Sequence, residues 1–158
     1  MNNAILNQLI AMLNQALIAL INLRYPSNLV ILATGIRDYE GLPGALNYQL
    51  CNPGDCRPSP EGYLPKYEPV VIVDTDTDPA YPYHKGKFAK FPSYAIGWTY
   101  LLNLLRNMIE NHPNWTLNEL MAAYAPATDA NEPLAYAANL GRRLGENPAT
   151  YQIKHILT

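Results

Sequence analysis

The first 23 residues carry no charged side chain and repeat an apolar pattern every seven residues. Two adjacent units share this pattern, residues 7–13 (NQLIAML) and residues 14–20 (NQALIAL), each with Asn-Gln at its start, Leu at its end and apolar residues between. This periodicity predicts a helix over residues 1–24 with a broad apolar face and a narrow polar stripe. The stripe consists of amide side chains, Asn7, Gln8, Asn14, Gln15 and Asn22. An apolar face of that breadth needs a partner larger than one neighbouring helix.

Three fates are open for residues 1–24. The heptad pattern favours self-association, which would make the chain a homo-oligomer, whereas the shortage of flanking charges favours docking on the rest of the chain or on a virion partner. The segment is long enough to span a bilayer, but its five amides would be costly there, which disfavours a membrane role. It has no basic start and no small-residue cleavage site, so we do not interpret it as a secretory signal. We expect an assembly or anchoring element.

Residues 25–158 predict a second unit, a mostly helical α+β domain. Pro26 interrupts the first helix. A new apolar stripe at three- and four-residue spacing runs to Ile36, and Gly41 ends the helix that carries it. Further helices are predicted from Pro92-Ser93 to about Glu110, from the capping box Thr116-x-x-Glu119 to Tyr124, from Pro133 to Gly145, and as a short helix or tail after Pro148.

A stretch between these helices has a different composition. Residues 58–87 are rich in Pro, Gly, Tyr and Asp and contain one clear strand signal at residues 70–73. They predict a loop-and-hairpin subdomain inserted into the helical domain.

Composition narrows the class of function. With 158 residues and 49% hydrophobic side chains, the chain is long enough for one domain with its own core. The net charge of −2 and the thin spread of eleven basic residues argue against a nucleic-acid partner. The twelve tyrosines suit stacking on sugar rings as well as core packing.

Glu40 is the strongest candidate for chemistry. It stands at the predicted end of the helix that precedes Gly41. A general acid must be rigidly held and partly desolvated to stay protonated near neutral pH, and the end of a packed helix provides both conditions. A glutamate in this position is also common as a solvated surface residue.

Cys51 and Cys56 flank a predicted tight turn, Asn52-Pro53-Gly54-Asp55. We expect a disulfide between them, which would fix the loop and indicate an oxidising compartment. Two buried thiols are the alternative. We predict no metal here and no cofactor, because the chain supplies only three scattered histidines.

Three alternating carboxylates, Asp74, Asp76 and Asp78, resemble the opening of an EF-hand loop. The sixth position is Pro79 rather than Gly and the twelfth is Lys85 rather than Glu, which excludes an EF-hand. Other calcium binding and an exposed acidic loop both remain open.

Several short motifs follow one another along residues 28 to 150. They are Glu40-Gly41, Tyr48, Asn52-Pro53-Gly54, Arg57, Gly86–Ser93, Gly97-Trp98, Thr116-Leu117, Ala122–Pro126, Asn131, Ala135-Tyr136 and Leu144-Gly145. Their order resembles the phage lysozyme-like muralytic proteins, which are themselves similar to lytic transglycosylases. The chain departs from the usual pattern at Cys51 and Asp55, and in the insertion after residue 57.

This resemblance implies a lysozyme-like fold that cleaves peptidoglycan glycan strands between N-acetylmuramic acid and N-acetylglucosamine, in a phage virion or in the host periplasm or cell wall. Glu40 would act as acid and then as base. Tyr48, Asn52 and Tyr124 would hold the sugars or orient Glu40, and Asp55 is the nearby loop candidate for a second carboxylate. Hydrolysis and transglycosylation both stay open. A second hypothesis is a non-catalytic virion protein that reuses the fold for structure or wall binding.

Overall fold

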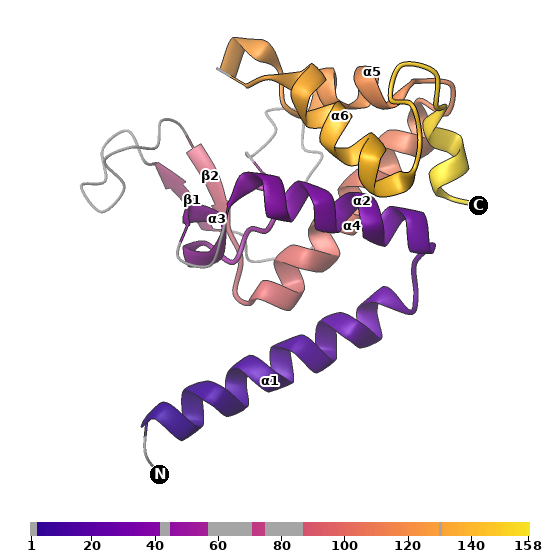
Figure 1. Cartoon of the computed structure of the whole chain (residues 1–158). Coiled ribbons are helices and arrows are strands. Elements are labelled where there is room, and N and C mark those ends of the chain that lie inside the picture. The colour runs from indigo at the N-terminus through magenta and orange to yellow at the C-terminus, as the bar shows by residue number, and fades with distance from the viewer. Residues whose placement is uncertain (1–2, 42–44, 57–70, 75–86, 130) are drawn as a thin grey trace.

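The protein is mostly helical, with one small antiparallel hairpin (Figure 1). The computed structural model describes residues 3–41, 45–56, 71–74, 87–129 and 131–158. Its elements are α1 (Asn3–Asn22), α2 (Ser27–Glu40), α3 (Leu46–Gln49), β1 (Val71–Asp74), β2 (Lys87–Lys90), α4 (Tyr94–Asn111), α5 (Leu117–Tyr124), α6 (Pro133–Leu144) and the 3-10 helices Ala127–Asp129 and Ile153–Ile156.

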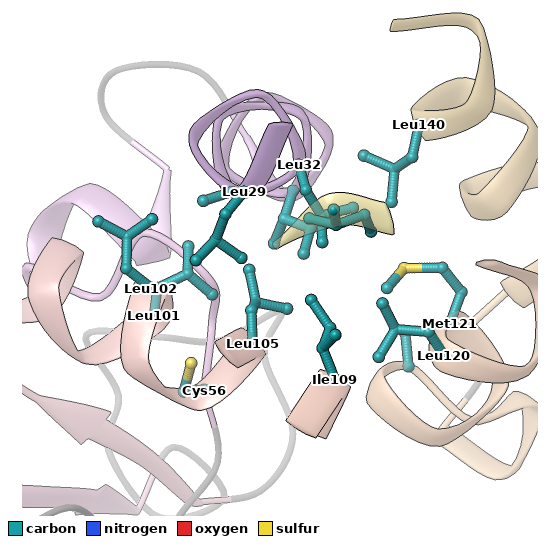
Figure 2. Packing of buried hydrophobic residues seen from close by; sticks show 14 of the residues in the cluster. Leu29, Leu32, Cys56, Leu101, Leu102, Leu105, Ile109, Leu120, Met121 and Leu140 are labelled. Carbon is teal, nitrogen blue, oxygen red and sulfur yellow. The ribbon is translucent and has the colours of Figure 1, made fainter. Parts of the chain in front are cut away.

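The core lies where α2, α4, α5 and α6 meet. Helix α2 packs against both α4 and α6, and α5 packs against α6. The apolar stripe predicted for α2 is fully buried in this core. Figure 2 shows side chains from all four helices gathered in it: Leu29, Leu32, Leu101, Leu102, Leu105, Ile109, Leu120, Met121 and Leu140. Burial of this set fixes the direction of α2 and therefore the position of its last residue, Glu40.

The caps that the sequence predicted are formed. The Ser93 side chain accepts a hydrogen bond from the Ile96 N–H at the start of α4. At α5, the Glu119 carboxylate accepts from the Thr116 N–H at 2.7 Å, and the Thr116 hydroxyl accepts from the Glu119 N–H at 3.3 Å. Gly145 ends α6 in the left-handed conformation, with φ of 75°. These predicted helix boundaries are confirmed.

The hairpin is attached to the loop that follows α3. Strands β1 and β2 pair antiparallel, with Ile72 opposite Ala89. The Ala89 N–H donates to the Cys56 carbonyl at 3.0 Å, and Phe88 packs with Leu46 in a small second core cluster. The predicted strand at residues 70–73 is found one residue later. Residues 58–70 and 75–86 of the predicted insertion lie outside the described part of the chain.

Helix α1 touches the domain through its C-terminal part. Ile18 and Ile21 pack against the core, and the Trp98 indole N–H donates to the Asn22 side-chain oxygen at 2.7 Å. The large apolar residues nearer the N-terminus are exposed, so the domain itself does not cover the apolar face. By length and composition α1 is also long enough to cross a membrane. The apolar face of α1 therefore still needs a partner outside the domain.

Candidate functional site

Glu40 is the last residue of α2, as the apolar stripe and the following glycine predicted. The Gly41 N–H closes the helix by donating to the Arg37 carbonyl at 3.3 Å. Gly41 has a φ of 154°, and a Cβ there would lie 2.6 Å from the Ala45 Cβ. The chain can therefore turn away directly after Glu40, which leaves its side chain at the rim of the core.

The Glu40 carboxyl is half-buried and is held by a tyrosine from α6. The Tyr136 hydroxyl donates to Glu40 Oε1 at 2.9 Å, and it also lies 3.3 Å from the Ile36 carbonyl oxygen. Tyr136 is only 1% exposed, so the donor is rigidly placed. Burial raises the pKa of Glu40 above its ordinary value, and the Tyr136 hydrogen bond opposes this in part. The carboxyl therefore keeps its proton to a higher pH than an exposed glutamate.

An aromatic cluster surrounds this pair. The Tyr39 ring stacks on Tyr136 with centroids 4.0 Å apart and an interplanar angle of 16°, and Tyr124 meets Tyr136 edge-on at 6.5 Å. Tyr39 is 43% exposed, whereas Tyr136 is buried. An exposed ring beside a carboxyl can stack on a sugar. Sequence reasoning assigned no site role to Tyr39 or Tyr136. The signal for Tyr39 was its adjacency to Glu40, and the signal for Tyr136 was the Ala135-Tyr136 motif.

Tyr124 connects the aromatic cluster around Glu40 to the loop of residues 51–56. Its hydroxyl donates to the Gly54 carbonyl at 2.7 Å. A Cβ on Gly54 would collide with that hydroxyl, so the glycine permits the close approach. The predicted site residue Tyr124 therefore lies beside Tyr136 and holds the loop against the helices.

Asn52 is fully buried, and all its described bonds go to backbone atoms. Its amide NH₂ donates to the carbonyls of Cys56 and Ala89, and its side-chain oxygen accepts from the Cys56 N–H, each at 2.9 Å. A side chain engaged in this way is not available to a sugar. Of the two roles expected for Asn52, the structure favours positioning, through the loop.

The predicted disulfide between Cys51 and Cys56 is wrong, because both are free thiols. Cys56 Sγ is buried in the main core and lies 3.8 Å from the Tyr124 hydroxyl. Burial raises its pKa to about 12, and the carboxylates of Asp55 and Glu40 add to the shift. The two Asn52 hydrogen bonds to Cys56 close the turn without a covalent link. The disulfide argument for an oxidising compartment therefore falls away.

Asp55 and Tyr48 occupy different surroundings. Asp55 sits in the turn with a φ of 47°, a conformation that Asp tolerates better than most residues. The loop that carries Asp55 is connected to Glu40 through Tyr124, which bonds to Gly54 and meets Tyr136 edge-on. Tyr48, on α3, instead stacks on Tyr94 of α4 at 5.2 Å. The fold thus groups Glu40, Tyr124, Asn52 and Asp55 around one loop, while the described ring contact of Tyr48 is with α4.

Within the described residues, no group of three or more His, Cys, Asp or Glu side chains is placed to hold a metal ion. Asp76 and Asp78 lie outside those residues, so calcium binding there stays untested. Comparisons of the chain with family models, curated proteins and solved structures found no match.

Proposed function

We propose that this protein cleaves peptidoglycan glycan strands between N-acetylmuramic acid and N-acetylglucosamine, with Glu40 as general acid and then base. The observation that supports it most is the half-buried Glu40 carboxyl, whose pKa is raised by burial and whose position is fixed by Tyr136. The exposed Tyr39 ring beside it offers a surface for a sugar. The ordered motifs that resemble lysozyme-like muralytic proteins of phages supply the substrate class and a lysozyme-like fold.

In the proposed reaction, Glu40 gives its proton to the glycosidic oxygen as the bond from that oxygen to the sugar C1 breaks. The resulting carboxylate then takes a proton from the hydroxyl that attacks C1. If Glu40 is the sole carboxylate, the substrate's own 6-hydroxyl or N-acetyl group serves as internal nucleophile. The first of these gives an anhydro-sugar end, as in lytic transglycosylases.

Asp55 is the candidate for a second carboxylate because it stands in the loop that Tyr124 holds beside the Tyr136–Glu40 pair. A carboxyl separation of about 5 Å would suit a nucleophile, and about 6.5–9.5 Å would suit a base that activates water. Mass spectrometry of digested peptidoglycan distinguishes the products, since anhydro ends indicate transglycosylation and reducing ends indicate hydrolysis.

Glu40→Gln tests the assignment. The variant should keep its fold and its wall binding but lose at least about 99% of wall-clearing activity, since general acid catalysis contributes roughly a hundredfold or more. Glu110→Gln is the matched control, because Glu110 is an exposed residue on α4 that pairs with Arg106. It should retain parental activity. More than about a tenth of parental activity in Glu40→Gln would rule out the assigned role.

The second candidate is a non-catalytic virion protein in which the same fold serves structure or wall binding. The exposed apolar face of α1 favours it, because that face suits assembly. If sacculi incubated with the parental protein bind it but are not cleaved, that result would support this candidate. A catalytic domain mounted on a virion would satisfy both ideas.

A further inference from the structure

The two faces of α1 are oriented in opposite directions relative to the domain. On the amide side, Asn14 and Ile18 are half-buried, and Asn22 bonds to Trp98. On the opposite side, Leu13 is 70% and Leu20 is 62% exposed. An amphipathic helix on a soluble domain normally turns its apolar face inward. Here the side that meets the domain carries Asn14 and Asn22 together with Ile18 and Ile21, and the broad leucine face points away from it.

The docking of the C-terminal end of α1 fixes this orientation. Trp98 is 1% exposed, donates to Asn22, and has the Arg37 guanidinium 5.7 Å from its ring centroid. Just beyond α1, the Tyr25 hydroxyl donates to Asn103 of α4 at 2.9 Å. In Figure 1, α1 runs below α4 and its N-terminal part extends away from the rest of the molecule. The apolar face is therefore presented outward along its whole length.

A bilayer fits this arrangement poorly. The helix is attached to the domain through Ile18, Ile21 and Asn22, so its last turn cannot enter a hydrocarbon core. This attachment shortens the membrane-length window Ala4–Asn22 to residues 4–17, which rise about 21 Å at about 1.5 Å per residue, short of a hydrocarbon core of about 30 Å. A helix lying flat on a membrane typically carries Lys and Arg on its polar face, and this polar face carries amides.

A second copy of the same helix fits better. The outward face repeats at alternating three- and four-residue spacing, the a and d pattern of a coiled coil. Leucines occupy each a position, and the d positions hold two leucines and one alanine: Leu6, Leu13 and Leu20 at a, and Leu9, Ala16 and Leu23 at d. The flanking e and g positions are apolar too, with Ile10, Leu17, Ile5 and Met12. This stripe is wider than the seam of a two-helix coiled coil.

We propose that α1 assembles three or more copies of this chain through its outward leucine face, while Ile18, Ile21 and Asn22 hold the helix of each copy to its own domain. The interface is self-complementary because every copy presents the same heptad register. Because the apolar stripe is wider than the seam of a two-helix coiled coil, each helix can contact two neighbouring helices rather than one. This proposal does not depend on the reaction proposed above.

A charge placed on either face of α1 in the full chain tests the proposal. By light scattering after size exclusion, the parental protein should have at least three times the monomer mass of 17.6 kDa. Leu13→Glu should reduce it to one monomer mass, since a buried carboxylate at an a position is strongly unfavourable. Gln15→Glu adds the same charge on the amide face and should leave the oligomer intact. Circular dichroism should show equal helix content in all three.

Two results would overturn the proposal. One is a parental protein of fewer than three monomer masses, and the other is a Leu13→Glu variant with the same mass as Gln15→Glu. Flotation with vesicles of neutral and anionic phospholipid adds a third readout. A parental protein that is monomeric in buffer and floats with vesicles, while Leu13→Glu does not, would assign the face to lipid instead.

Discussion

Burial and the hydrogen bond from Tyr136 act in opposite directions on the pKa of Glu40. Burial favours the neutral carboxyl, whereas the Tyr136 hydroxyl stabilises the carboxylate by hydrogen bonding to it. Because burial wins, the pKa of Glu40 is raised, and the acid form is present at low pH and lost as pH rises through the raised pKa. A reaction that needs the acid form would decline over the same range.

Tyr136→Phe should shift that range. Phenylalanine keeps the ring that stacks on Tyr39 but removes the hydroxyl, so the pKa of Glu40 should rise further. The alkaline limb of the pH–activity profile should move to higher pH, and a carboxyl NMR titration of Glu40 should move with it. An unchanged Glu40 titration would show that the hydroxyl does not act on the carboxylate.

The two cysteines provide a second test at single residues. Denatured, unreduced protein should take two alkyl labels, because both thiols are free. In the native state Cys56 should stay unlabelled at neutral pH, since it is buried and its pKa is about 12, whereas Cys51 is partly exposed. If the denatured protein needed reduction before it took any label, the free-thiol description would be wrong.

At the level of elements, the site depends on how closely α4 approaches the loop of residues 51–56. A Cβ on Gly97 would collide with the Cys51 carbonyl oxygen and would lie 3.0 Å from the Pro53 ring. Glycine at this point of α4 therefore sets the distance between the helix and the loop that Asn52 and Tyr124 hold. The helix thus supports the loop, and the loop in turn contacts the tyrosine cluster around Glu40.

Gly97→Ala should destabilise the protein even though alanine favours helix. The intrinsic gain of about 0.5–1 kcal/mol is outweighed by overpacking, which costs typically about 1–3 kcal/mol where backbone has to move. Urea unfolding should show a lower midpoint. Asn107→Ala, at an exposed position of the same helix, should change stability by no more than about 0.5 kcal/mol. A higher urea midpoint for Gly97→Ala would mean that the loop of residues 51–56 can move away from α4 without loss of stability.

At the scale of the whole molecule, α1 divides into a free part and a docked part. Residues before Ile18 have exposed apolar side chains and lie outside the core, whereas Ile18, Ile21 and Asn22 contact the domain. The same helix therefore serves two purposes: its last turn belongs to the fold, and its remainder is available for assembly.

Two truncations separate these purposes. Deleting residues 1–16 should give a monomer with an unchanged urea midpoint. Deleting residues 1–24 also removes the Asn22 bond to Trp98 and uncovers the core beneath Ile18 and Ile21, so it should cost roughly 1–3 kcal/mol. Tryptophan fluorescence would follow unfolding in both. Equal stability of the two truncations would contradict the division.

The sequence by itself determined the five longest helices and their approximate ends, but not the short α3 or the 3-10 helix Ala127–Asp129. The signals are local: heptad spacing for α1, the apolar stripe and Gly41 for α2, Ser93 for α4, the Thr116–Glu119 box for α5, and Pro133 and Gly145 for α6. Each acts within a few residues through side-chain periodicity or a backbone hydrogen bond, so it can be read without knowing the fold.

Tertiary structure alone decided the contents of the site. Tyr136 reaches Glu40 across 96 residues of chain, and Asn52 bonds to Ala89 across 37. It also left Cys51 and Cys56 as free thiols, since Cys56 is held in the core and Asn52 already closes the turn. Packing between distant helices sets these contacts, and no local pattern records which side chains will meet. The outward apolar face of α1 has the same origin, because the bond between Asn22 and Trp98 fixes which side of the helix meets the domain.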